Sequence, residues 1–309
     1  MATIESNIMI KLTNDAFIKA RNYLLAEGRI LEKRLFDYYF ESGSSSGVFH
    51  SILAYQNDDG GFGWGLEPDT ASPESQPLFT VMALLWLDRA QRLDVETIKQ
   101  SLGFLLPLTF DDGGLPWMLK PNREYPRANH FDKPMHRSVI TITAPIVGLC
   151  EKYGIHNEWT NKASKFVWES IKEQQDEHVQ CAQCMHQRLF FLENTSNSLL
   201  AERAITSLRS WISSKNFTCF NVSHPEAGLY LHPTPTCYAN HPDSALRPAF
   251  SDEQINASLD ALISRQDETG AWATGYGYPN YLNPGMHWDG MYTINALKTL
   301  KDYDRIEVL

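Results

Sequence analysis

Apolar residues recur at every third or fourth position along most of the chain, and this spacing predicts amphipathic α-helices. No stretch has the convincing apolar–polar alternation of a half-buried strand. Glycine-rich turns separate several of the apolar stretches. The pattern predicts about eleven helices, at residues 15–26, 30–41, 48–55, 77–90, 95–106, 138–153, 159–173, 178–192, 197–211, 252–264 and 289–303.

The segment 217–250 breaks this pattern. It is rich in proline and lacks apolar periodicity, so we expect a long irregular insertion there. An irregular connection of that length in a compact domain usually serves function or covers another part of the protein. The remaining sequence suits one all-helical domain over residues 1–309.

Three glycine turns resemble one another and occur at related spacings. The first two lie 53 residues apart, and the third follows after 157 residues, close to three times that distance. A period of about 52 residues fits a helical hairpin with its connections, and such a hairpin must stack on its neighbours to bury its apolar face. The turns span residues 56–62, 109–115 and 266–272.

The helix after each turn carries a threonine three residues before an alanine. This shared Thr-x-x-Ala spacing aligns the three copies and supports the interpretation as a repeat. A stack of such hairpins fits both an open solenoid and a closed ring. The aligned threonines are Thr80, Thr141 and Thr293.

One of the turns matches a known repeat. Gln266, Gly270 and Trp272 fit the Gln-x-x-x-Gly-x-Trp pattern of squalene and terpenoid cyclases, and Gln56 with Phe62 resembles the form common in protein prenyltransferase β-subunits. The chain therefore resembles the prenyltransferase and squalene-cyclase repeat superfamily. The resemblance implies an all-α fold, an α/α toroid in which about six helical hairpins place inner and outer helices around a central cavity. It does not fix the activity, because that fold hosts several.

The resemblance does not extend to the chemistry of the named activities. The Asp-x-Asp-Asp motif of cyclases that start by protonation is absent, and Met291 replaces the thiolate in the zinc signature Asp-Gly-Cys-Tyr of farnesyltransferase-like subunits. A second set of zinc-type residues lies on a predicted helix, where the residues do not all share one face and so cannot all bind the same ion. We therefore expect no cofactor, and a divalent metal ion would have no clear ligand set. The second set is His178, Cys181, Cys184 and His186.

The glycine-rich stretch 60–70 is the best candidate for chemistry. Four glycines in six residues let the backbone approach a ligand closely, and Glu67 and Asp69 flank a proline that stiffens the turn. Such a pair divides acid and base roles when the environment separates the two pKa values. Capping of the next helix by either carboxylate is the structural alternative.

The starts of the repeat helices contribute a second set of polar residues. In a ring these N-termini would gather at one mouth of the cavity, where the helix dipole favours anions. Capping and hydrogen bonds between helices are the structural alternative. The set is Gln76, His136, Arg137, His287 and Asp289, of which Asp289 and His287 join Glu67 and Asp69 as predicted catalytic residues.

A basic segment, residues 120–137, stands out in an acidic chain. Its arginines and lysines suit a diphosphate-bearing isoprenoid or a uronate, and a solvated loop is the simpler alternative. The formal charge of −10 argues against nucleic acid or an anionic membrane as the main partner. The segment contains Lys120, Arg123, Arg127, His130, Lys133, His136 and Arg137, of which Arg127, His136 and Arg137 are predicted to bind substrate.

Aromatic residues make up 12% of the chain, and many of them lie at the turns. Rings on a cavity wall stabilise carbocations through their π faces, and rings also stack on sugars. Phe62 and Trp272 belong to the repeat and are interpreted as packing residues. The predicted pocket residues are Trp64, Trp117, Tyr276, Trp288 and Tyr292.

The remaining features predict a cytoplasmic protein. The first residues lack the basic and apolar regions of a signal peptide, and the longest mostly apolar stretch, 139–150, is too short to span a bilayer. Five cysteines, an odd number, suit reduced thiols better than a disulfide framework. The oligomeric state is left open.

Together these residues favour a small-molecule enzyme that resembles terpenoid cyclases and acts on an isoprenoid or isoprenyl diphosphate by carboxylate acid–base chemistry. A carbohydrate-active lyase or hydrolase with paired carboxylates and stacked tryptophans is the first alternative. A repeat scaffold without catalysis is the second. A deep apolar cavity would favour isoprenoids, an open polar groove would favour sugars, and a flat apolar face would favour the scaffold.

Overall fold

The computed structural model describes residues 9–120, 124–132, 136–173, 182–214, 217–229, 232–275 and 284–307. Within these ranges the chain is helical, and its only β-type pairings are isolated bridges. A helix is present at each of the eleven predicted places. The elements are α1 (Asn14–Glu27), α2 (Ile30–Phe40), α3 (Ser45–Leu53), α4 (Pro77–Arg89), α5 (Val95–Leu105), η1 (Leu106–Leu108), η2 (Asn129–Asp132), α6 (Ile140–Lys152), α7 (Glu158–Glu173), α8 (Ala182–Asn194), α9 (Ser198–Ile212), α10 (Pro235–Tyr238), η3 (Arg247–Ala249), α11 (Asp252–Ser264) and α12 (Pro284–Asp302).

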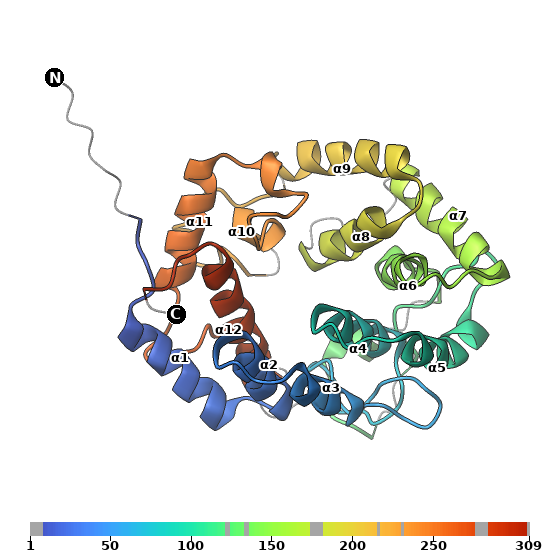
Figure 1. The fold of residues 1–309 in the computed structure, drawn as a ribbon, viewed down its shortest axis with the longest axis horizontal. Coiled ribbons are helices and arrows are strands. Elements are labelled where there is room, and N and C mark those ends of the chain that lie inside the picture. Colours follow the sequence, from blue (N-terminus) through green and yellow to red (C-terminus); the bar gives the residue numbers. More distant parts are fainter. Residues whose placement is uncertain are drawn as a thin grey trace.

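Figure 1 shows these helices as a ring with two layers, in which the even-numbered helices lie inside and the odd-numbered helices outside. Burial explains the division. The inner helices α4 and α6 are buried at all but two of their 13 positions, whereas the outer helix α5 buries one stripe, at Thr97, Ile98, Ser101, Leu102 and Leu105. A helix that is apolar all round belongs in the interior, and an amphipathic helix covers it. The predicted all-α toroid is confirmed.

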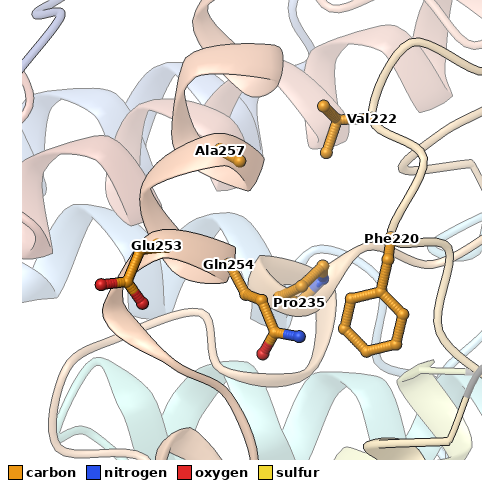
Figure 2. Close-up of a pocket in the computed structure, with 6 residues that line it drawn as sticks. All are labelled: Phe220, Val222, Pro235, Glu253, Gln254 and Ala257. Carbon is orange, nitrogen blue, oxygen red and sulfur yellow. The ribbon is translucent and has the colours of Figure 1, made fainter.

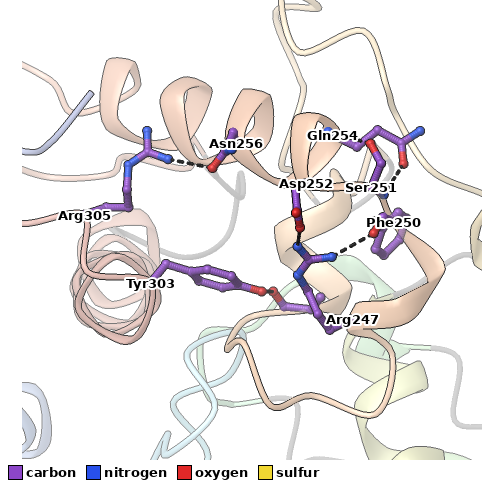
Figure 3. Close-up of polar contacts among 9 residues, drawn as sticks. Arg247, Phe250, Ser251, Asp252, Gln254, Asn256, Tyr303 and Arg305 are labelled. Carbon is purple, nitrogen blue, oxygen red and sulfur yellow. Dashed lines mark hydrogen bonds and ion pairs between the residues drawn. The ribbon is translucent and has the colours of Figure 1, made fainter. Parts of the chain in front are cut away.

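The two ends of the chain close the ring. Leu12 donates its N–H to the Arg305 carbonyl at 2.7 Å and accepts the N–H of Glu307 at 3.0 Å. The Arg305 side chain is buried, and its guanidinium donates to Asn256 (Figure 3) and to Asp260, both on α11. The first and last hairpins therefore bury their apolar faces against each other, as internal hairpins do.

The three glycine turns make equivalent contacts around the ring. Gly60, Gly113 and Gly270 have φ angles of +85°, +92° and +96°, and each lies against the backbone of an outer helix, α5, α7 or α1. Two residues after each glycine, a backbone N–H donates to a threonine hydroxyl of the next inner helix. These pairs are Phe62–Thr80, Leu115–Thr143 and Trp272–Thr293, at 2.9 to 3.1 Å.

The middle copy corrects the sequence alignment by two residues. Thr143, and not Thr141, accepts the N–H of Leu115, so the residue equivalent to Gln76 is Val139. The predicted alignment was wrong because this helix carries threonines two residues apart, and the Thr-x-x-Ala spacing selects the one that does not meet the glycine turn. The contact with the glycine turn selects one of the two.

We expect Gly270→Ala to destabilise the closed ring. A Cβ at Gly270 would lie 2.4 Å from the Lys19 carbonyl carbon in α1, and the φ angle of +96° is strained for any L-residue. The free energy of unfolding, measured by chemical denaturation, should fall by about 3 kcal/mol. Gly103→Ala in α5, with no atom within 4 Å of the new Cβ, should be neutral or stabilising by up to about 1 kcal/mol. Similar losses in both variants would contradict this account.

The segment 217–250 is packed rather than wholly irregular, since it contains α10 and η3. Arg247 donates to the Phe250 carbonyl at 2.7 Å and pairs with Asp252 at the start of α11 (Figure 3). Ser251 and Gln254 form a capping box on the same helix. The segment is thereby fastened to the outer layer at its C-terminal end.

The apolar stretch 139–150 forms most of the inner helix α6. Among the described residues, no helix combines the length and apolar character that crossing a bilayer requires. The described cysteines form no disulfide.

Candidate functional site

Glu67 and Asp69 lie in the loop between α3 and α4 that the glycine-rich stretch forms. They are 6% and 7% exposed, and the Asp69 N–H donates to Glu67 Oε2 at 3.0 Å. The N-cap of α4 is Gln76, and no side chain makes a capping hydrogen bond there. The alternative in which one of these carboxylates caps the helix is therefore wrong.

Arg29 holds the loop that carries the two carboxylates. Its guanidinium donates to the carbonyls of Gly65 and Leu66, both at 3.0 Å, and pairs with Glu32 at 2.6 Å. The side chains of Arg29 and Glu32 are 10% and 1% exposed. Because both charges have left water, each depends on the other and on the loop carbonyls for its solvation. The loop conformation is thus set from α2 as well as by its own glycines.

Asp69 is contacted by side chains from two other parts of the ring. Trp288 Nε1 of α12 donates to Asp69 Oδ1 at 2.5 Å, and His130 Nε2 lies 3.2 Å from Asp69 Oδ2. Backbone pairing brings His130 there, because the Asp69 carbonyl accepts the N–H of Ala128 at 2.7 Å. We call Glu67, Asp69, His130 and Trp288 the carboxylate cluster.

The two carboxyl groups of the cluster have different environments. Burial, reinforced by the negative charge of Asp69, raises the pKa of Glu67 well above its ordinary value, and the Asp69 N–H and Arg29 oppose this only in part. Asp69, in contrast, has an indole N–H and an imidazole as partners, which suits an ionised carboxylate. The two neighbouring carboxyl groups therefore lie in different environments, and their division into an acid and a base stays a prediction.

Glu67→Gln should flatten part of the pH dependence of stability. A carboxyl whose pKa is higher in the folded state contributes stability that is fully present below its unfolded pKa of about 4.3 and is lost as the pH rises through the folded pKa. Wild-type protein should therefore lose more unfolding free energy than Glu67→Gln in chemical denaturation as the pH rises above about 4.3. Glu74→Gln, an exposed carboxylate of the same loop, should keep the wild-type profile. Identical profiles for Glu67→Gln and wild type would show that Glu67 is not held protonated.

Aromatic rings adjoin the cluster at both His130 and Trp288. Trp117 stacks on Phe131 with ring centroids 5.3 Å apart and lies 5.8 Å from the His130 ring. Trp288 meets Tyr292 edge-on at 6.2 Å. The structure thus brings Trp117, Trp288 and Tyr292 to one place, and their role in substrate binding stays a prediction.

Two other predicted pocket residues are not part of this group. Trp64 is 58% exposed, and its indole N–H donates to Asn57 at 2.8 Å rather than to the carboxylates. Tyr276 lies outside the described residues.

The basic segment 120–137 is only partly available for an anion. Arg127 pairs with Asp132 at 2.7 Å, so its charge is already balanced. His136 and Arg137 are exposed and precede α6. In the corrected alignment, Val139 and not Arg137 takes the N-cap position that Gln76 has in α4. Arg123 and Lys133 lie outside the described residues.

Asp289 and His287 lie in the first turns of α12, close to the cluster residue Trp288. Asp289 Oδ1 accepts the N–H and the hydroxyl of Thr274 at 2.7 and 2.9 Å, the structural alternative foreseen for this position. Burial, with the charge of Arg29, lowers the pKa of His287. Its buried Nδ1 has no hydrogen-bond partner among the residues that the structure describes. A catalytic role for either residue stays a prediction.

Sequence reasoning missed three contributors to this site. Arg29 and Glu32 have the i,i+3 spacing of a local ion pair, but the spacing does not reveal that the pair is buried or that it holds another loop. In the sequence, His130 belongs to the basic segment, although its Nε2 lies 3.2 Å from Asp69. The spacing in the sequence therefore indicated the Arg29–Glu32 ion pair, but nothing in it indicated that His130 contacts Asp69.

Metal-type residues gather elsewhere in the described chain. The side chains that come close enough to share an ion are His224, Glu226 and His232, in the segment 217–250. Of the zinc-type set on the predicted helix 178–192, the ring of His186 bonds to the Cys237 carbonyl at 2.8 Å, and His178 and Cys181 lie outside the described residues.

A pocket of about 210 Å³ lies between α11 and the segment 217–250 and contains none of the predicted site residues. Figure 2 shows an apolar wall beside one carboxylate and one amide. The pocket is smaller than is usual for a drug-sized ligand. Its lining residues are Phe220, Val222, Pro235, Glu253, Gln254 and Ala257.

No protein-family model matches the sequence, and no curated protein matches it. Solved structures match in fold. A protein from Actinoplanes superposes with a TM-score of 0.57 at 13% identity, over 92% of this chain and 98% of that one. The type II terpene cyclase MstE from Scytonema, solved as a variant in complex with its substrate geranylgeranyl dihydroxybenzoate, superposes with a TM-score of 0.53 at 9% identity, over 93% and 97%. At these identities the likeness concerns the fold alone, and the chain has a terpenoid-cyclase-like helical toroid.

Proposed function

We propose that this protein is a small-molecule enzyme, similar to the cyclases that start by protonation, and that its substrate carries an isoprenoid chain. The observation that carries the proposal is the carboxylate cluster, in which Glu67 is buried beside Asp69 and its pKa is raised well above its ordinary value. The terpenoid-cyclase-like fold supports it. Glu67 and Asp69 would take the place of the missing Asp-x-Asp-Asp motif.

The reaction begins with transfer of the Glu67 proton to a substrate alkene. The π electron pair forms the new C–H bond and leaves the neighbouring carbon cationic, while Glu67 becomes a carboxylate. Attack by a second alkene then closes a ring and moves the positive charge along the chain. Loss of a proton from carbon to a base ends the sequence, so substrate and product have the same mass.

His130 is suited to return the proton to the cluster. Its side chain is 43% exposed while its Nε2 lies 3.2 Å from Asp69, so one ring joins solvent to a buried carboxylate. Asp69 in turn contacts Glu67 through its N–H. A proton taken from water by His130 can pass to the Asp69 carboxylate, and we propose that this carboxylate returns it to the neighbouring Glu67 after each turnover. The Asp69 backbone N–H only holds Glu67 in place.

The aromatic rings supply the surroundings that a carbocation needs. Trp288, Tyr292 and Trp117 adjoin the cluster, and their π faces attract a cation without capturing it as a nucleophile would. The charge of Asp69 adds electrostatic stabilisation near the first cationic carbon.

The proposed substrate class is a prenyl chain on a polar or anionic head group. The Scytonema enzyme was solved with such a molecule and is spanned over 97% of its length by this chain. Because the match also covers 93% of this chain, we propose that residues 1–309 form one domain. The segment 120–137 would then meet the head group.

A thermal-shift screen with isoprenyl diphosphates, prenylated aromatic acids and oligosaccharides tests the substrate class. We expect prenyl compounds to raise the melting temperature and to yield an isomer of unchanged mass with an altered chromatographic retention. In D2O the product should gain deuterium at carbon, because the first step delivers a solvent-exchangeable proton.

Stabilisation by oligosaccharides alone would overturn the isoprenoid proposal in favour of the carbohydrate-active alternative. Native mass spectrometry that captures a stable protein partner, together with no response to either ligand class, would favour a scaffold. A prenyl product without deuterium would show that the reaction does not start by protonation.

A further inference from the structure

Three metal-type side chains come together outside the carboxylate cluster, in the connection between α9 and α10. His224, Glu226 and His232 each offer a ligand atom within 4.8 Å of the others. His232 Nε2 lies 3.0 Å from Glu226 Oε2. The rings of His224 and His232 are stacked, with centroids 4.4 Å apart and planes 27° from parallel.

Backbone hydrogen bonds hold the chain that carries these side chains. The Cys219 N–H donates to the Pro233 carbonyl at 2.8 Å and closes the base of the loop, and the Gly228 N–H donates to the His232 carbonyl at 2.7 Å. A further bond runs from the Glu226 N–H to His224 Nδ1 at 3.2 Å. A loop held in this way binds a ligand at a low cost in conformational entropy.

The ligand types are also those that a transition-metal ion uses. Nδ1 of His224 accepts the backbone N–H of Glu226 at 3.2 Å, which orients this ring relative to Glu226. Glu226 supplies a carboxylate oxygen close to His232. Two imidazoles and one carboxylate form a ligand set that zinc uses in proteins, with a fourth position for water.

We propose that His224, Glu226 and His232 bind a divalent transition-metal ion, with Zn²⁺ as the leading candidate, and that the ion fastens this connection of the ring. Two nitrogen ligands out of three favour such an ion over Mg²⁺ or Ca²⁺, which prefer oxygen. The site shares no residue with the carboxylate cluster and does not depend on the proposed enzyme activity.

Zinc titration of untagged, chelator-stripped protein against a chromophoric indicator tests this site. We expect one tight site per chain and a loss of affinity of at least about 100-fold in His232→Ala and in Glu226→Gln. His156→Ala, which alters an exposed histidine between α6 and α7, should bind as wild type does. Affinity should fall as the pH is lowered, because protons compete with the metal ion for the ligand atoms.

Co²⁺ spectroscopy and thermal melting give two further readouts. Nitrogen and oxygen ligands should produce visible cobalt bands without a thiolate charge-transfer band, and zinc should raise the melting temperature of wild type but not of His232→Ala. A thiolate band would place the ion with a cysteine and overturn the proposal. Absence of stoichiometric binding, or unchanged binding in both ligand variants, would overturn it as well. Melting of each variant in metal-free buffer shows whether it is folded.

Discussion

Glu67→Gln is expected to lower kcat for the prenyl substrate by about 10²- to 10⁴-fold while the protein stays folded. Glutamine has nearly the same size and still accepts the Asp69 N–H, but it has no acidic proton to give to an alkene. Water does not replace the lost acid easily, because Glu67 is only 6% exposed. Product formation at saturating substrate, followed by mass spectrometry, measures the effect, and the melting temperature reports the fold.

Two companion variants locate the chemistry within the loop. Glu74→Gln makes the same chemical change at an exposed position of the loop and should keep wild-type turnover. Asp69→Asn removes a negative charge that raises the pKa of Glu67, so the decline of activity at high pH should move to lower pH. Full turnover in both Glu67→Gln and Asp69→Asn would show that the carboxylate cluster is not the catalytic site.

Arg29→Met is expected to lower the free energy of unfolding by about 3–5 kcal/mol, the typical cost of breaking a buried ion pair. The variant leaves Glu32 without its cation at 1% side-chain exposure. It also removes the donors from the carbonyls of Gly65 and Leu66, so the loop before Glu67 loses its support. Urea denaturation monitored by circular dichroism gives the free energy.

An exposed ion pair provides the matched control. Arg21→Met breaks the ion pair of Arg21 with Glu41, two side chains that are 39% and 37% exposed. The free energy of unfolding should then fall by less than about 1 kcal/mol. The double variant Arg29→Met with Glu32→Met should recover much of the loss, because neither charge is then buried alone. Equal costs for Arg29→Met and Arg21→Met would contradict the role given to Arg29.

The helices could be predicted because their signal is local. A helix such as α5 shows its buried stripe in the spacing of Ile98, Leu102 and Leu105, whatever the rest of the chain does. The glycine turns were recognisable for a similar reason, since Gly60, Gly113 and Gly270 all have positive φ angles, a conformation that favours glycine over other residues.

The register of the middle repeat could not be read in the same way. The Thr-x-x-Ala pattern selects Thr141, which precedes Ala144 by three residues, whereas the hydrogen bond from Leu115 goes to Thr143. With Thr143 as the aligned residue, His136 and Arg137 no longer lie at the helix start where the sequence alignment placed them. A repeat period of about 52 residues does not fix the alignment to a single residue. The tertiary contacts fix it.

The sequence by itself determined the helices, the repeating glycine turns and the loop in which Glu67 and Asp69 sit, because each depends on local spacing and backbone conformation. It left an open solenoid and a closed ring equally possible, and the contacts of Leu12 with Arg305 and Glu307 decide for the ring. Only the tertiary structure decided that Asp69 meets His130 and Trp288, the latter 219 positions away along the chain, and that Arg29 supports the loop from another helix. Burial and through-space charge, which set the pKa of Glu67, are properties of the folded ring and have no local signature.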